Sequence, residues 1–474
     1  MHQQSAQLLA LSDRYQRALE AILARVSFCS GAPDTPAAPA AIAVAYSGGL
    51  DSSVLLRLAQ QDAAARGIPL FAFHIHHGIS ANADAWLAHC EREAGRLGVT
   101  FVARRVRLDA GERSGVEEAA RVLRYAALGD LCRQHGVVLL LTAHHLDDQA
   151  ETVLLQLLRG SGVAGLSGMD AVNAAPTLLG DATLLMARPL LDVSRAELEA
   201  WAGRAGVVHV EDESNADARY ARNALRHGVM QQLGASFPGF QERLARSAGH
   251  MQAAQRLLLQ LAQDDLATCA DGACLDLDCL RALSSERLDN LLRHWLGVHG
   301  VRMPSTSWLA EMRAQLLDAK ADAQLCVSHP DCAIRRHRNR VYLTPKRDAD
   351  AACVAPQSFG WQGEACLDFP AYQGRVHFEP AEEGLDAAWL RQQTLLIRYR
   401  QGGDVVKLAA NRPTRSLKQH FQALGVPPWE RPFLPLVTAA QEVLYAAGIG
   451  MDSHRMAAGQ GAYIRLRWEH RVFP

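Results

Sequence analysis

A short glycine-containing loop between an apolar run and a helical segment constrains the fold of this chain more than any other feature. Residues 40–46 are apolar and have the length of a buried strand. Ser47-Gly48-Gly49-Leu50-Asp51-Ser52 follows at once, and residues 53–58 are typical of a helix. The two glycines permit a tight turn and the close approach of a ligand. Free N–H groups in such a loop, at a helix N-terminus, predict an anion site that most often takes phosphate.

This loop is not a Walker A motif, in which lysine directly follows glycine. The chain has only four lysines, Lys320, Lys346, Lys407 and Lys418, and none of them follows a glycine. The alternative interpretation is a plain strand–turn–helix unit whose glycines serve only the turn.

Apolar strands alternate with helices through the first part of the chain. The expected strands are 69–75, 100–106 and 137–142, and the expected helices are 82–97 and 116–134. This alternation predicts an α/β fold with a Rossmann-like parallel sheet whose two faces are both covered by helices. In such sheets ligands bind beyond the carboxyl ends of the strands, which is where the glycine loop lies.

Three acids follow the strand at 137–142, where the chain passes into another expected helix. Asp147 and Asp148 lie four and three residues before Glu151, so the three carboxylates share one helical face. Helix N-termini favour carboxylates, and an acidic cluster near a phosphate loop is also typical of a magnesium or amine site. The alternative is that these acids only cap the helix.

Two arginines later in the chain form a candidate anion clamp. Arg222 and Arg226 are four residues apart and share a face if this segment is helical. Guanidinium groups in this arrangement suit phosphate or carboxylate. A solvated basic face is the alternative.

One motif is misleading. Residues 160–165 match the dinucleotide pattern G-x-G-x-x-G, but they follow a helix and not the strand that NAD binding requires. We expect a flexible loop there.

Composition indicates three domains and a polyanionic partner. We expect a catalytic domain at 1–230, a mainly helical substrate-binding domain at 231–345 and a small α+β domain at 358–474, with strands at 326–345. The whole chain has a net charge of −1, but residues 391–474 carry 12 Lys and Arg against 5 Asp and Glu. A basic terminal domain on a neutral chain favours nucleic acid as a partner, and a merely solvated basic face is the alternative.

The cysteines and the apolar runs bear on location. None of the ten cysteines forms a Cys-x-x-Cys pair, so we expect reduced thiols. The five-residue spacing of Cys269, Cys274 and Cys279 is not typical of zinc sites. No apolar run has the length of about 18–20 residues that spans a membrane, and no signal peptide is apparent. We therefore expect a cytoplasmic protein with no membrane partner.

Taken together, these motifs resemble the tRNA(Ile)-lysidine synthetase family of the PP-loop ATP pyrophosphatase superfamily, over nearly the whole chain. The matching segments are Ser47–Ser52, Glu117 with Arg121, Arg124 and Tyr125, His144–Thr152, Arg159–Leu166, Glu211–Asn215, Arg222–Arg226, and residues 402–404, 416–418 and 428–431. The first segment alone indicates only the superfamily. Its combination with Glu211-Asp212-x-Ser214-Asn215 and the C-terminal segments is what selects the family.

The resemblance implies a carbon–nitrogen ligase that uses ATP and Mg²⁺. Its partners would be free L-lysine and the isoleucine tRNA with a CAU anticodon. The enzyme would adenylate the 2-oxygen of the wobble cytidine and release pyrophosphate. The side-chain amine of lysine would then attack the 2-carbon and release AMP, which leaves lysidine in the tRNA.

The resemblance also implies roles for individual residues. ATP would be bound by Ser47, Gly48, Gly49, Leu50, Asp51, Ser52 and Arg121. Asp51, with Asp148 or Asp147, would hold magnesium, and Glu151 would orient the amine and accept its proton, so that the expected catalytic residues are Asp51, Asp148 and Glu151. Asp147, Arg222 and Arg226 would bind the lysine substrate, although either arginine suits a phosphate equally well.

Three other functions remain open. A PP-loop tRNA thiolase would need Cys-x-x-Cys pairs, which this sequence lacks. A small-molecule amidotransferase of the superfamily would add a glutaminase cysteine, for which the sequence offers no candidate. A tRNA-binding protein that uses ATP only as a structural ligand would release no pyrophosphate.

Overall fold

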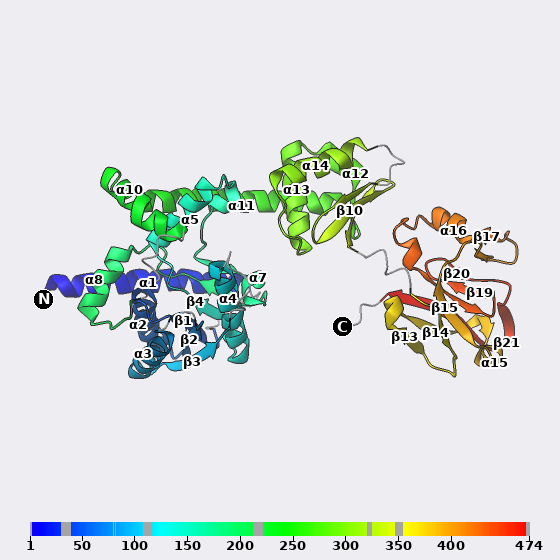
Figure 1. The fold of residues 1–474 in the computed structure, drawn as a ribbon, viewed down its shortest axis with the longest axis horizontal. Helices are drawn as coiled ribbons and strands as arrows, with labels where there is room; N and C mark the ends of the chain where they lie inside the picture. Colours follow the sequence, from blue (N-terminus) through cyan, green and yellow to red (C-terminus); the bar gives the residue numbers. More distant parts are fainter. Residues whose placement is uncertain are drawn as a thin grey trace. The chain divides into compact units, whose positions relative to one another are not determined.

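The computed structural model describes residues 2–29, 39–78, 80, 82–107, 116–211, 221–319, 325–346 and 354–470 (Figure 1). They form two compact units, Met1–Gln260 and Leu261–Pro474. The domain boundaries expected from the sequence, at 230, 345 and 358, stay predictions.

A six-stranded sheet organises the first unit, in the order β3-β2-β1-β4-β6-β5. The strands are β1 (Ile42–Ala45), β2 (Leu70–His76), β3 (Thr100–Arg105), β4 (Leu139–Leu141), β5 (Val172–Ala174) and β6 (Leu185–Ala187). All neighbouring pairs are parallel except β5 and β6. In the central strand, Val44 pairs with Ala72 on one side and with Leu141 on the other. The predicted α/β fold with a parallel sheet is confirmed.

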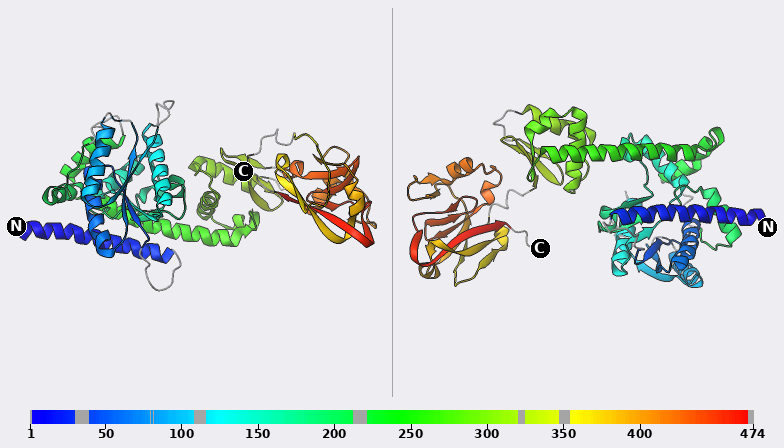
Figure 2. Two further views of the ribbon diagram at one scale, coloured as in Figure 1. Left: turned by 90° about the horizontal axis from the view of Figure 1, so that it is seen from below. Right: turned by 180° about the vertical axis from the view of Figure 1, so that it is seen from behind.

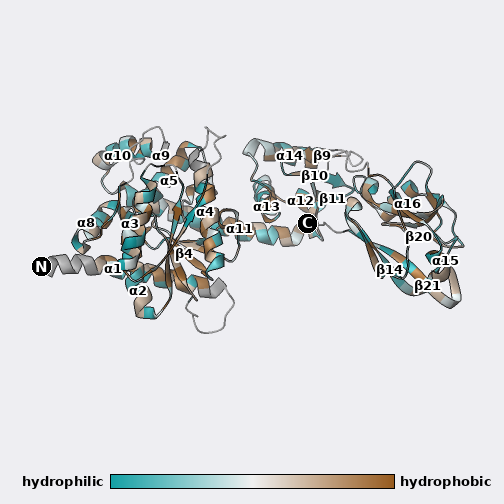
Figure 3. Cartoon of the chain, turned by 60° about the horizontal axis from the view of Figure 1, so that its bottom comes forward, coloured by the Kyte–Doolittle hydropathy of each residue, from teal (hydrophilic) through white to brown (hydrophobic). Residues whose placement is uncertain are grey.

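Helices cover both faces of this sheet because successive residues of its central strands point to opposite sides. Val44 lies in the core with α1 (His2–Cys29), α2 (Leu50–Arg66), α3 (Ala83–Arg96) and α8 (Arg195–Ala205). Its neighbour Ala43 lies in the opposite core with α4 (Val116–Gln134) and α7 (Pro176–Leu179). Figure 3 shows the hydrophobic residues, in brown, along the strands between these helices.

Short helices and one long helix complete the first unit. They are α5 (Leu146–Leu158), α6 (Val163–Leu166), α9 (Ala221–Ala224), a π-helix (Leu225–Val229), α10 (Met230–Ser236) and α11 (Phe240–Cys269), which continues into the second unit. Helices α1 and α11 are the two longest of the described chain, at 28 and 30 residues (Figure 2). Part of the loop expected to be flexible is thus the short helix α6.

The second unit begins with helices packed on an antiparallel sheet. Its helices are α12 (Leu277–Ala282), α13 (Ser285–Val298) and α14 (Thr306–Asp318). The sheet has the order β7-β8-β11-β10-β9, with β7 (Ala270–Asp271), β8 (Cys274–Asp276), β9 (Cys326–Ser328), β10 (Cys332–His337) and β11 (Arg340–Pro345). Leu291 of α13, Met312 of α14 and Ile334 of β10 meet in one core. The strands expected at 326–345 are β9, β10 and β11, and they form one sheet with β7 and β8 of the segment predicted to be mainly helical.

The C-terminal part contains three further sheets and four short helical segments among its described residues. The strands are β12 (Gln357–Phe359), β13 (Cys366–Phe369), β14 (Gly374–Asp386), β15 (Leu395–Tyr399), β16 (Val405–Val406), β17 (Arg415–Ser416), β18 (Pro435–Ala439), β19 (Glu442–Ala446), β20 (Gly450–Met451) and β21 (Ala457–His470). The helices are α15 (Ala387–Arg391) and α16 (Leu417–Leu424), with 3₁₀ turns at Pro370–Tyr372 and Arg431–Phe433. Because β12 pairs with β15, and β14 pairs with β21, residues before and after α15 belong to the same sheets.

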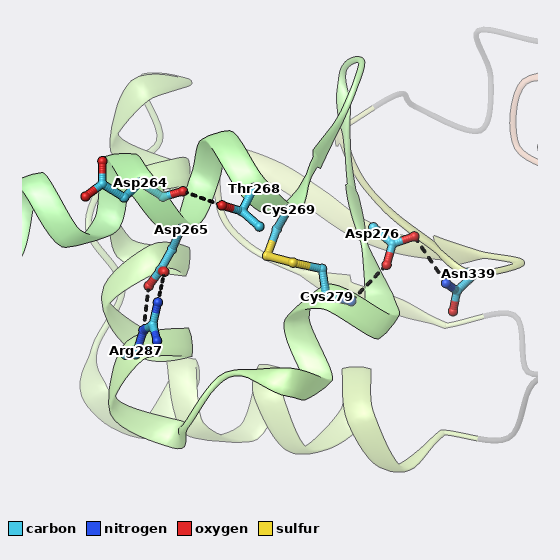
Figure 4. The surroundings of a disulfide bond; sticks show 8 residues. All are labelled: Asp264, Asp265, Thr268, Cys269, Asp276, Cys279, Arg287 and Asn339. Carbon is cyan, nitrogen blue, oxygen red and sulfur yellow. Dashed lines mark hydrogen bonds and ion pairs between the residues drawn. A yellow bond between two sulfur atoms is a disulfide. The ribbon is translucent and has the colours of Figure 1, made fainter.

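The expectation that all cysteines are reduced is wrong for one pair. A disulfide joins Cys269, at the end of α11, to Cys279 in α12, with the Cα atoms 5.3 Å apart (Figure 4). The β7–β8 hairpin between them reverses the direction of the chain and so brings the two cysteines together. The spacing of the cysteines in the sequence does not predict this contact. The free thiols among the described residues are Cys90, Cys132, Cys274, Cys326, Cys332 and Cys366. Within the described ranges, none of the helices combines the length and the apolar character needed to cross a bilayer.

Candidate active site

The Ser47–Ser52 loop leads from β1 into α2 with the geometry of an anion site. Gly48 has a φ of +86°, a backbone conformation that favours glycine. The hydroxyl of Ser52 lies 3.1 Å from that of Ser47 and donates to the carbonyl of Gly49 at 3.0 Å, which fixes the turn. Gly49 is the N-cap of α2, and because glycine has no side chain it provides no capping acceptor for the first-turn N–H groups. The first-turn N–H groups of α2 are therefore left for a ligand.

Gly48 is also required by its neighbours. A Cβ atom at this position would lie 2.7 Å from Sγ of Cys90 and 3.3 Å from Val210. The N–H of Val210 donates to the carbonyl of Gly48 at 2.9 Å. This bond places Glu211, the exposed first residue of a predicted motif, beside the loop. The rest of that motif, 212–215, lies outside the described residues.

The predicted acids Asp51, Asp147 and Asp148 all lie around one buried histidine, His145. Its Nε2 is 3.8 Å from Oδ2 of Asp51 and 3.4 Å from Oδ2 of Asp148. Its Nδ1 is 3.6 Å from Oδ2 of Asp147. His145 is the N-cap of α5, so the helix start carries the imidazole and two of its acids together. The structure thus joins the glycine loop to the second acidic motif.

Glu151, one turn further along α5, is held by both arginines of the predicted clamp. Nε of Arg222 lies 2.7 Å from one carboxylate oxygen, and Nε of Arg226 lies 2.6 Å from the other. Their Nη2 atoms also approach Oδ1 of Asp148, at 3.3 and 3.4 Å. The side chain of Glu151 is only 1% exposed. In this structure the anion in the clamp is therefore Glu151 itself.

Comparison with known proteins assigns this arrangement to a family. Models of the PP-loop domain, the TilS substrate binding domain and the TilS substrate C-terminal domain match residues 14–233, 275–342 and 395–468. The tRNA(Ile)-lysidine synthase of Ralstonia nicotianae is 43% identical over 432 residues, which cover 89% of this chain and 92% of that relative. The chain belongs to the tRNA(Ile)-lysidine synthase family. The synthase of Burkholderia pseudomallei is 40% identical, with 92% of this chain and 93% of that relative covered.

The family resemblance drawn from the sequence and the expectation of an enzyme are thereby confirmed. A U34-tRNA thiolase from Methanococcus maripaludis is a distant structural neighbour, with 16% identity and a TM-score of 0.38. It covers 50% of this chain and 79% of its own. Similarity of this degree lends no support to the thiolase alternative.

Burial and charge set opposing pKa shifts in this lysidine synthase site. Burial disfavours a charge on Asp147, but His145 and the N–H of Arg195 lower its pKa to about 2. Burial likewise opposes ionisation of Asp148, yet His145 and Arg222 lower its pKa. Asp51 behaves differently, because burial raises its pKa more than His145 and Arg195 lower it. The pKa of His145 is raised by the three acids despite its burial. An imidazolium among these acids thus stabilises their charge.

Arg121, predicted to reach ATP, lies on α4, and no ion pair joins it to these acids among the described residues. Its guanidinium is 5.0 Å from the ring centroid of Tyr125. Burial lowers the pKa of His144 to about 3, and the charges of Arg188, Arg222 and Arg121 add to this against the opposing effect of Asp148. The side chain of Glu117, in the same predicted motif, lies outside the described part of the chain. The contact of Arg121 with ATP therefore stays a prediction.

Two further residues, which were not predicted from the sequence, contact the acids. Nη1 of Arg195 lies 2.5 Å from Oδ2 of Asp51, and its backbone N–H donates to Oδ2 of Asp147 at 2.7 Å. The amide of Gln241 donates to Oδ1 of Asp147 at 3.3 Å. The available signal was the Ser-x-x-Glu capping box at the start of α8, which places Arg195 at a helix N-terminus.

Two carboxylates of the site fit a magnesium ion shared with a substrate. Oδ1 of Asp51 is buried and has no hydrogen-bond partner among the described residues. Asp148 approaches the same nitrogen of His145 as Asp51 does. Across the described ranges, no group of three or more His, Cys, Asp or Glu side chains forms a metal cage. Such a sparse donor set suits Mg²⁺, which usually takes one or two carboxylates and completes its shell with water and phosphate oxygens.

Proposed function

We propose that this enzyme joins free L-lysine to the 2-carbon of the wobble cytidine in the isoleucine tRNA with a CAU anticodon. The observation that carries the proposal is the junction at His145, where Asp51 of the PP-loop and Asp148 of the second motif meet. At this junction the PP-loop, which would bind ATP, lies beside the acids of the second motif, which would bind the amine of lysine. We infer a cytoplasmic location from the tRNA substrate.

In the first step the 2-oxygen of cytidine attacks the α-phosphorus of ATP. An oxygen–phosphorus bond forms, the bond from the α-phosphorus to the bridging oxygen breaks, and pyrophosphate leaves. The first-turn N–H groups of α2 would stabilise the charge that grows on this leaving group. A magnesium ion held by Asp51 and Asp148 would neutralise further phosphate charge.

In the second step the side-chain amine of lysine attacks the 2-carbon of the adenylated cytidine. The cationic amine first gives up a proton, a carbon–nitrogen bond then forms, and the carbon–oxygen bond to AMP breaks. Glu151 would accept that proton, but both of its oxygens are held by Arg222 and Arg226 in this structure. We propose that the carboxylate of lysine takes over one arginine and so frees Glu151. Asp147, with its pKa at about 2, would remain ionised beside the substrate's cationic amine.

The tRNA backbone would be bound by exposed basic residues of the second unit. Arg400, Arg412, Arg415 and Lys418 are exposed and have no ion-pair partner among the described residues. Other arginines of the same domain are already neutralised, as Arg455 is by Glu442. Unpaired cations of this kind bind phosphates without reading the base sequence.

The reaction itself tests the proposal. Wild-type enzyme should release pyrophosphate when ATP and the CAU-anticodon isoleucine tRNA are present, and should release AMP only when lysine is added. Release of AMP with the tRNA but no use of lysine would require another nucleophile.

A further inference from the structure

Arg195 connects the PP-loop to the second acidic motif although it belongs to neither. Its Nη1 lies 2.5 Å from Oδ2 of Asp51, across 144 residues of sequence. Its own N–H donates to Oδ2 of Asp147 at 2.7 Å. The guanidinium therefore lies at the first turn of α2, where the N–H groups of the anion site begin.

The helix that carries Arg195 is fixed in place by several bonds. Ser194 and Glu197 form a capping box at the start of α8. Nη1 of Arg14, on α1, lies 2.6 Å from Oε1 of Glu197. The carbonyl of Val193 accepts from the N–H of Leu146, the first residue of α5, at 2.8 Å. Arg195 is thus presented to the PP-loop by a rigid support, as a preorganised binding group requires.

The guanidinium still has donors to offer. Its Nη1 is used by Asp51, and its Nε donates to Oε1 of Glu199 at 3.0 Å. Its Nη2 has no partner among the described residues, and the side chain is 42% exposed. Arginine carries five N–H donors in a fixed fork that matches phosphate oxygens. A cation with spare donors beside a phosphate loop is suited to bind the phosphates.

We propose that Arg195 is a further ATP-binding residue, whose guanidinium contacts the pyrophosphate half of ATP in the PP-loop. The proposal deepens the proposed function, since it rests on ATP being the nucleotide bound there. Arg195 would hold Asp51 in place before ATP arrives and would offset the charge of the departing pyrophosphate. The other interpretation of the same contacts is a latch that only ties α8 to α2.

A comparison of ATP binding with AMP binding distinguishes a phosphate contact from a latch between α8 and α2. Binding of ATP and of AMP is measured by calorimetry with wild-type enzyme, Arg195→Gln, Arg195→Lys and the control Arg204→Gln. Arg204 is exposed on the same helix and has no partner among the described residues, so its variant matches the loss of one charge. The proposal predicts that Arg195→Gln weakens ATP binding by about tenfold or more, since a hydrogen bond between charged groups is lost. AMP binding stays unchanged, Arg195→Lys recovers part of the ATP affinity, and Arg204→Gln matches wild type.

Kinetics and stability supply the second readout. In tRNA-dependent pyrophosphate release, Arg195→Gln should raise the KM for ATP and leave the KM for lysine unchanged. The proposal is overturned if ATP binding is unchanged, or if ATP and AMP binding fall equally, and a large drop in Tm would likewise assign a latch. Nucleotide binding needs neither tRNA nor lysine. The test therefore still decides the role of Arg195 if wild-type enzyme fails to incorporate lysine, which would contradict only the proposed function.

Discussion

The carboxylate of Asp51 lies 3.8 Å from Nε2 of His145, so a residue of the PP-loop meets the N-cap of the helix that carries the second acidic motif. The two residues are far apart in sequence and come together because β1 and β4 are adjacent parallel strands. Both strands end at the same edge of the sheet, where the loops that follow them converge. This relationship underlies the first two predictions.

Asp51→Ala should abolish pyrophosphate release and leave tRNA affinity unchanged. The carboxylate lies in the PP-loop, with one oxygen that lacks a partner among the described residues, whereas the basic residues proposed to bind tRNA lie in the second unit. Filter binding at fixed salt and a pyrophosphate assay check the two properties. Full activity in the variant would refute the assignment of Asp51.

His145→Gln should reduce stability most at low pH. Its pKa is raised in the folded protein, so folding favours the protonated imidazole. This stabilisation is complete below the unfolded pKa of about 6.5 and is lost as the pH rises through the folded pKa. The Tm difference between wild type and variant should therefore be larger near pH 5.5 than near pH 9, by about 2 °C or more for a change of about 1 kcal/mol. The exposed His250→Gln is the control, and a Tm difference that grows with pH would contradict the account.

Arg226→Gln should raise the KM for lysine by about tenfold or more and leave the KM for ATP near its wild-type value. The variant removes one of the two cations that hold Glu151, whose side chain is 1% exposed. It should also cost about 1–3 kcal/mol of stability, because a buried carboxylate loses a charged hydrogen bond. Steady-state kinetics with each substrate varied in turn checks this, with the exposed Arg246→Gln as control. A higher KM for ATP alone would show that the clamp serves a phosphate.

A triple variant tests the tRNA surface without removing a domain. The loss of three unpaired cations should weaken tRNA binding and lower the salt dependence of log Kd by about 1 for each lost phosphate contact. The variant is Arg412→Gln, Arg415→Gln and Lys418→Gln. A matched control removes three cations that acids already neutralise, namely Arg455, Arg465 and Arg467. Equal losses of tRNA affinity in the two triple variants would contradict a specific basic surface.

Deletion of residues 391–474, the segment with the surplus of basic residues, would not be a clean test of tRNA binding. It would remove β15 and β21, the partners of β12 and β14, and leave two unpaired sheet edges. The charge count identifies a basic segment but does not show where the fold can be divided.

The sequence predicted the elements that depend on local pattern. The helix expected at 116–134 is α4, and the apolar run that ends in two glycines became β1 and the loop after it. Strands β5 and β6 were missed, because the apolar runs around them are shorter than the run at 137–141 that predicted β4.

Local sequence patterns did not predict the contacts between segments that are distant in the sequence. The clamp arginines and Glu151 were each identified, but their mutual pairing across 71 and 75 residues depends on the tertiary fold. The same holds for Arg195, whose contact with Asp51 has no sequence signature.

Incorporation of labelled lysine tests the central claim most directly. Purified enzyme, ATP, magnesium and labelled lysine are incubated with a transcript of the isoleucine tRNA that has a CAU anticodon, and with methionine tRNA, which shares that anticodon, as control. The account predicts label on the isoleucine tRNA alone, with AMP and pyrophosphate released in equal amounts. Absence of label on the isoleucine tRNA while ATP is cleaved would contradict lysine as the nucleophile.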